Sequence, residues 1–186
     1  MTPVRRGGRL DGPSGQHWIW SIAEGTRGTR WREVATDGGG VTRSILLEVT
    51  QAGRPQRLEV ATRAGLLTLH PEVDGSALHG NVVTPDGIRH LTFPWTDENV
   101  LLVMASPVAA AVIVRSLPPM EVGATTGLDV VRLDDLLEPD VDRVTVTRSA
   151  RDAWSIQPTS GGPSSDVRLD TGGLPTGSSA SDWPLE

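Results

Sequence analysis

The chain has 186 residues, which is enough for one domain, and 37% of them are hydrophobic, which is enough for a buried core at this size. The formal net charge is −6, so the chain as a whole lacks the positive charge that binds nucleic acids or anionic membranes. It contains no Cys, and all 17 of its basic residues are Arg. This composition excludes disulfides, thiolate metal sites and lysine chemistry of the Schiff-base or P-loop kind.

The first 15 residues combine Arg, Gly and Pro and lack an apolar segment. We expect them to form a disordered arm rather than a secretory signal, followed by a single domain over residues 16–186. The longest apolar run, residues 100–114, is shorter than the roughly 20 residues that cross a bilayer, and Ser106-Pro107 interrupts it. These features predict a cytoplasmic protein without integral membrane association.

Alternating segments separated by turn residues follow one another along the chain. Trp18 and Trp20 are two positions apart in residues 17–23, so a strand would place both on one face. In residues 41–50, Ile45, Leu47 and Val49 alternate with more polar positions. Further short strands are expected at 31–34, 58–61, 65–69, 78–83, 88–95, 100–104, 141–147, 154–156 and 167–169.

The turn signals between these segments recur about every 8–12 residues, which predicts an all-β meander in the form of a barrel, sandwich or roll. We expect strand residues to exceed helical residues at least about threefold, although helix is the commoner state in globular proteins. One segment is ambiguous. Residues 107–117 fit a short helix with Ser106 as N-cap and Pro107 in its first turn, and they also fit a loop that runs into a strand.

The polar residues form few patterns that indicate a metal, cofactor or ligand site. The four His residues have no zinc-site spacing and the acidic run at 134–142 has no calcium-loop spacing, so no metal or cofactor is predicted. His90 is the most notable candidate, because it lies in a strand-like segment with Phe93 and Trp95. It is either a hydrogen-bonded strand residue or a polar group inside an apolar binding cavity.

Tryptophan is the strongest compositional signal, since the chain has six Trp, one Phe and no Tyr. Tryptophan offers a large apolar surface with a hydrogen-bond donor at one edge. These residues either fill an ordinary core or line a cavity for an apolar or aromatic ligand. The candidates for such a cavity are Trp18, Trp20, Trp95 and Trp154.

From Gly65 onward the order of motifs resembles a bacterial family named for glycolipid binding. The matching elements are Asp74-Gly75, the segment 106–117 that ends in Ile113-Val-Arg115-Ser-Leu117, Glu121-Val-Gly123, Leu169-Asp-Thr-Gly-Gly-Leu174 and a final Asp182-Trp183-Pro184. The Thr-Asn centre of the family's motif is replaced here by apolar residues 108–112. The resemblance implies an antiparallel spiral β-roll or half-barrel around a hydrophobic hollow, similar to periplasmic lipoprotein carriers. A relative of similar architecture from violacein biosynthesis is a cofactor-independent enzyme.

Two hypotheses of function follow, with a third in reserve. The first is a binding protein whose hollow holds a lipid-like or other amphipathic small molecule, with Arg115 as partner for an anionic or sugar head group. The second is a cofactor-independent enzyme that uses the same hollow, with His90 or an acid for proton transfer. The third is a protein interaction module with a filled core. The sequence carries no signal for a particular oligomeric state.

Overall fold

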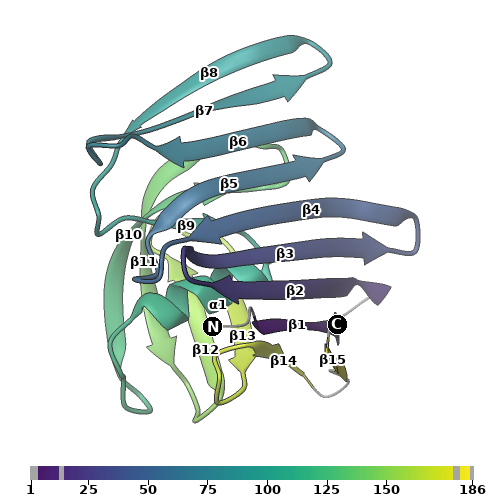
Figure 1. The fold of residues 1–186 in the computed structure, drawn as a ribbon, viewed down its shortest axis with the longest axis vertical. Helices are drawn as coiled ribbons and strands as arrows, with labels where there is room; N and C mark the ends of the chain where they lie inside the picture. The colour runs from purple at the N-terminus through teal and green to yellow at the C-terminus, as the bar shows by residue number, and fades with distance from the viewer. Residues whose placement is uncertain (1–3, 13–14, 178–180, 185–186) are drawn as a thin grey trace.

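The computed structural model describes residues 4–12, 15–177 and 181–184, and within them it contains fifteen strands and one ten-residue helix. The predicted excess of strand over helix, and with it the all-β class, is confirmed. Two curled sheets enclose the helix between them, so that the molecule is a half-barrel (Figure 1). Among the described residues no helix is long and apolar enough to cross a membrane.

The larger sheet has nine antiparallel strands in the order β15-β1-β2-β3-β4-β5-β6-β7-β8. Apart from β15 this is an up-and-down meander of hairpins, as the regular spacing of turns predicts. Its strands are β1 Val4–Asp11, β2 His17–Gly25, β3 Gly28–Asp37, β4 Gly40–Val49, β5 Pro55–Thr62, β6 Gly65–Pro71, β7 Ala77–Thr84, β8 Gly87–Pro94 and β15 Ser181–Pro184.

The smaller sheet has six strands in the order β14-β13-β12-β11-β10-β9. All its neighbours are antiparallel except β9 and β10, which run parallel because helix α1 (Pro107–Ser116) and the segment after it connect them. The remaining strands are β9 Val100–Val103, β10 Thr125–Leu133, β11 Asp140–Arg148, β12 Ala153–Pro158, β13 Ser165–Leu169 and β14 Pro175–Thr176.

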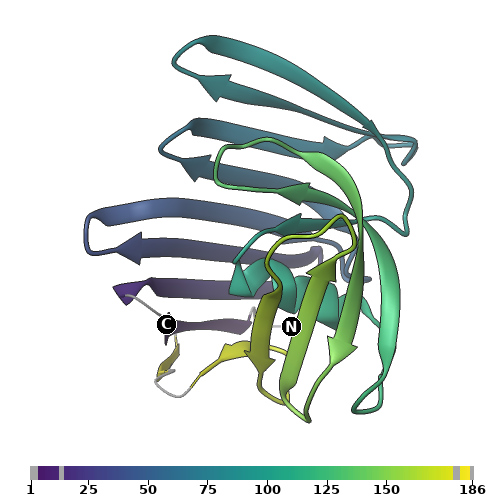
Figure 2. The same ribbon diagram turned by 180° about the vertical axis from the view of Figure 1, so that it is seen from behind.

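The ambiguous segment 107–117 is a helix and not a strand. Ser106 caps α1, since its side chain accepts a hydrogen bond from the backbone N–H of Ala109, and Pro107 lies in the first turn. Six consecutive residues, Val108 to Ile113, are buried, because α1 lies inside the half-barrel against β3, β9, β13 and β14. Figure 2 shows α1 between the two sheets. The buried side chains at positions 109–111 are alanines, whose small size allows close packing around the helix.

The N-terminal residues differ from the sequence-based expectation. Residues 4–11 of the expected arm form β1, which pairs with β2 on one side and β15 on the other, and Leu10 is part of the core. The glycines that suggested disorder have a packing role, because a Cβ on Gly8 would lie 2.8 Å from the Trp20 ring. Residues 1–3 and 13–14 lie outside the described residues.

This packing predicts that Gly8→Ala destabilises the protein, although alanine is normally better than glycine in a strand. The added methyl group collides with Trp20, which is 2% exposed and cannot move into solvent. We expect a loss of about 1–3 kcal/mol, typical of overpacking, measured as a melting temperature lower by roughly 2–4 °C per kcal/mol. Gly25→Ala is the matched control, since nothing lies within 4 Å of its Cβ position. Equal melting temperatures for the two variants would mean that β1 is not docked.

Candidate functional site

The interior of the half-barrel is filled rather than hollow. Helix α1 and the inward faces of both sheets form one continuous hydrophobic cluster, which includes Trp20 and Trp31. The pockets that can accept a ligand therefore lie at the ends and edges of this core. Two of them contain a tryptophan predicted to bind ligand, and one of these two borders the N-terminus of α1.

The N-terminus of α1 is held by a buried carboxylate. Glu33 on β3 is 1% exposed, and its Oε2 accepts hydrogen bonds from the Ser106 hydroxyl at 2.7 Å and from the Val108 backbone N–H at 3.1 Å. Helix N-termini leave N–H groups unsatisfied and carry partial positive charge, so a carboxylate at this position is stabilised. Glu33 thereby joins the large sheet to the first turn of the helix.

Arg43 on β4 completes this cluster, which we call the Glu33–Arg43 lock. Its Nη2 lies 3.1 Å from Glu33 Oε1 and donates to the carbonyl of Ala105 at 2.9 Å, and its Nη1 donates to the carbonyl of Met104 and to Asp135. Its Nε has no hydrogen-bond partner among the described residues. Ala105 has a φ of 53°, a left-handed conformation that is costly for alanine. The lock thus fixes the strained turn that leads into α1.

Burial raises the pKa of Glu33 above the ordinary value of a glutamate, because the charged form is removed from water. The charge of Arg43 and the hydrogen bonds from Ser106, Val108 and Arg43 all oppose this rise in pKa. The Arg43 guanidinium and the Val108 N–H can only donate, whereas the Ser106 hydroxyl can donate or accept. The geometry therefore fits an ionised carboxylate that acts as a structural acceptor.

The Ser106 end of α1 forms the floor of a pocket of about 450 Å³ between the two sheets. We call it the inter-sheet cleft. One wall comes from β1, β2 and the turn between them, and the other from β13, β14 and their flanking residues. Its lining residues are Leu10, Asp11, Gly12, Gln16, Trp18, Ala105, Ser106, Pro107, Ser164, Ser165, Asp166, Val167, Arg168, Thr176 and Gly177.

Trp18 is the largest apolar group in this cleft. It is partly buried and packs against the core on the inward face of β2. Gly12 lies directly against its ring, since a Cβ there would be 2.3 Å from the indole. Leu10, Pro107 and Val167 supply further apolar surface. The exposed surface of the cleft is mainly apolar, although eight of its fifteen lining residues are polar or charged. Such a combination of apolar surface and polar groups is typical of small-molecule sites.

The cleft lining contains more negative than positive side chains, and some of them are ion-paired. Arg168 pairs with Asp152 at 2.8 Å, and Asp11 contacts Arg9 and His17. Asp166 is exposed, and Gln16 and Ser164 also belong to the lining. Two carboxylates and one arginine give the lining a net charge of −1. This balance favours a ligand whose polar end carries hydroxyl or amino groups rather than an anion.

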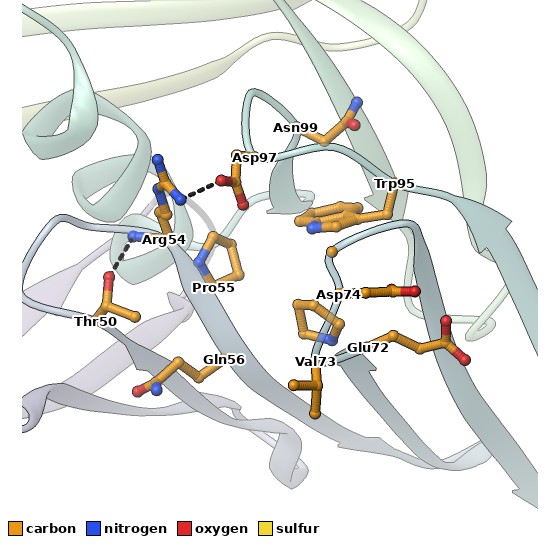
Figure 3. A pocket seen from close by; sticks show the side chains of 12 residues that line it. Thr50, Arg54, Pro55, Gln56, Glu72, Val73, Asp74, Trp95, Asp97 and Asn99 are labelled. Atoms are coloured by element: carbon orange, nitrogen blue, oxygen red, sulfur yellow. Dashed lines mark hydrogen bonds and ion pairs between the residues drawn. The ribbon is translucent and has the colours of Figure 1, made fainter.

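Trp95 lies in a separate pocket of about 430 Å³, formed by the start of β5, the β6–β7 turn and the loop after β8 (Figure 3). The side chain of Trp95 is only 5% exposed. Around it are polar residues, among them the Arg54–Asp97 ion pair and Asp74, whose pKa is lowered by hydrogen bonds from Ser76. The pocket is more polar than the inter-sheet cleft and fits an amphipathic ligand less well.

The six residues expected to bind ligand do not meet in one place. Trp18 lines the inter-sheet cleft and Trp95 lines the second pocket. Trp20 is buried in the core, and Trp154 is half-buried beneath Arg148. Arg115 stacks over Trp31 at 5.2 Å and pairs with Glu24 at 2.7 Å. His90 is exposed on the outer face of β8, where its Nδ1 lies 2.6 Å from Asn81 Oδ1.

The sequence analysis missed Glu33 and Arg43, although a signal for them was present. The alternation of Ile45, Leu47 and Val49 places Arg43 on the same inward face when it is extended by two residues. Likewise Glu33 is two residues from Trp31 on β3. A charged residue in register with a buried face predicts a buried partner of opposite charge.

Glu33 and Asp135 both bond Arg43, and the lock predicts that replacing them lowers the free energy of unfolding by very different amounts. Glu33→Gln places an amide N–H₂ beside the Arg43 guanidinium and removes the buried counter-charge of Arg43, so we expect a loss of about 3–5 kcal/mol in unfolding free energy. Asp135→Asn is the control, since Asp135 is 72% exposed and exposed pairs contribute about 0–1 kcal/mol. Urea denaturation measures both. Similar small losses would show that Glu33 does not anchor the helix.

Comparisons with known proteins support the fold. No protein-family model matches the chain, and none of the curated proteins matches it. The structure is similar to the crystal structure of a DUF1089 family protein from Pseudomonas aeruginosa, with 18% sequence identity, a TM-score of 0.52, and coverage of 91% of this chain and 86% of that one. Identity at this level shows the fold alone, so the chain shares a curled β architecture with this bacterial protein.

Proposed function

We propose that the protein binds an amphipathic small molecule in the inter-sheet cleft, with the apolar part of the ligand against Trp18. The observation that carries this proposal is the cleft itself, a pocket of about 450 Å³ whose exposed surface is mainly apolar and whose lining also includes polar and charged residues. Its volume lies in the usual range of ligand sites, about 300–1,000 Å³. Its position between two curled sheets also corresponds to the mouth of a barrel, where small ligands are commonly bound.

The sequence resemblance to glycolipid-binding proteins supports the same class of ligand, and the fold is compatible with it. The charged residues of the cleft indicate which head group the ligand carries. Arg168 is paired with Asp152, and Asp166 is exposed at the rim. A neutral hydroxylated or cationic head group is therefore favoured over a carboxylate. This replaces the earlier expectation that Arg115 receives an anionic head group, since Arg115 lines a different pocket and is paired with Glu24.

Trp18→Leu should weaken ligand binding by about tenfold or more, because it removes much of the apolar contact surface. The measurement is isothermal titration with dodecyl maltoside below its micellar concentration. Trp154→Leu is the matched control, since Trp154 is also half-buried on a strand but does not line the cleft. Equal affinities of both variants, or no binding by the wild type to any dodecyl compound, would overturn the proposal.

Head-group preference provides a second test. Three ligands with the same dodecyl chain, namely dodecylamine, dodecyl maltoside and dodecanoate, should bind with dodecanoate weakest, because the exposed Asp166 repels its carboxylate, whereas Asp11 is paired with Arg9 and Arg168 with Asp152. Asp166→Asn should reduce the advantage of dodecylamine over dodecanoate several-fold. Asp152→Asn is the control, since it should free Arg168 and improve binding of dodecanoate. A preference for dodecanoate in the wild type would contradict the polarity assigned to the rim.

A further inference from the structure

The last strand of the large sheet, β8, has a free edge. It pairs with β7 on one side, and no strand lies on its other side in the described residues. Both views show the β7–β8 hairpin standing clear of the smaller sheet, with nothing alongside β8 (Figures 1 and 2). At the opposite end of the sheet, the four-residue strand β15 pairs with β1 and is the edge strand. The eight-residue β8 is the longer of the two edge strands.

The register identifies which backbone groups point to this free edge. The two-residue turn Pro85-Asp86 makes Thr84 and Gly87 a hydrogen-bonded pair, so alternation assigns the bonds to β7 to Arg89, Leu91 and Phe93. The N–H and C=O groups of Ile88, His90 and Thr92 therefore point outward. Pro94 continues this series, and its missing N–H is tolerated because that position makes no bond to β7.

The edge also lacks most of the features that normally prevent strand pairing. Natural edges are protected by charged side chains, prolines or bulges. The outer face of β8 carries Ile88, His90 and Thr92, with no Asp, Glu or Arg among them. Arg89 points to the other face, where it donates to the carbonyl of Leu137. Pro94 interrupts only the end of the strand.

Exposed apolar side chains adjoin the edge. Ile88 is 65% exposed, and the register places it beside Val83 and then Leu66, each 41% exposed. These three side chains form a row across β6, β7 and β8 on the outer face. A strand added to β8 would extend this row and cover part of Ile88.

We propose that β8 pairs antiparallel with β8 of a second copy of this chain, about a two-fold axis at His90. The three outward residues are centred on His90, so the two-fold rotation places Ile88 opposite the partner's Thr92 and His90 opposite the partner's His90. Each such pair exchanges two backbone hydrogen bonds, and all outward N–H groups of Ile88, His90 and Thr92 find acceptors. The second copy is the occupant because this edge is complementary to itself. The result is one continuous sheet across the dimer.

The first test compares Thr92→Pro with Thr92→Ala. Both variants lose the contact between Thr92 Oγ1 and His79, but only proline removes an outward N–H. Sedimentation velocity over micromolar concentrations should show a dimer for the wild type and the alanine variant. The proline variant should dissociate at concentrations at least about tenfold higher, because each dimer loses two hydrogen bonds. A monomeric wild type, or a proline variant that dimerises normally, would overturn the proposal.

The second test uses the position of the two-fold axis and covers the case that the proline variant misfolds. His90 is exposed, so His90→Glu and His90→Lys should both fold. Each variant alone places like charges opposite each other and should dimerise more weakly than the wild type. An equimolar mixture should recover dimer, since Glu then faces Lys. A mixture that behaves as the average of its components would overturn pairing at His90.

Discussion

The structure depends on an ion pair that is buried where a helix enters the core. A charge removed from water is costly unless it is paired and hydrogen-bonded, and Glu33 and Arg43 meet this condition through each other and through Ser106, Val108 and the backbone before the helix. The lock connects two strands of the large sheet to the first turn of α1. It therefore determines where the helix lies, and the helix determines which parts of the half-barrel are filled.

The filled interior limits where a ligand can bind. A curled sheet by itself would enclose a hollow, but α1 brings six consecutive buried residues into it. Space remains where the helix begins, beside Trp18, and at the far end near Trp95. The inter-sheet cleft thus borders the same turn that the lock holds. Ligand binding and helix anchoring are expected to be coupled through Ala105 and Ser106, which belong to both.

An open half-barrel has edge strands with unpaired backbone N–H and C=O groups, which a closed barrel does not have. At one end the C-terminal strand β15 pairs with β1 and becomes the edge strand, which is only four residues long. This arrangement brings both ends of the described chain to the same side of the sheet. At the other end the edge strand is the eight-residue β8, and a second copy would pair with it. Strand β1 is tightly packed at this end of the sheet, because Gly8 lies directly against the Trp20 ring.

The sequence by itself determined the all-β class and most of the strands, and it offered Ser106 as the N-cap of α1 in one of two alternatives, because alternation and turn residues act over a few neighbouring positions. It also placed Arg43 on a buried face, although that signal was overlooked. Other features depend on contacts between residues far apart in the sequence, and only the tertiary structure decided them. Glycine-rich β1 is a strand because Trp20 and β15 lie beside it, and residues 107–117 are a helix because the hollow between the sheets is apolar. The predicted tryptophans are dispersed because sheet curvature, and not spacing along the chain, decides which inward positions meet.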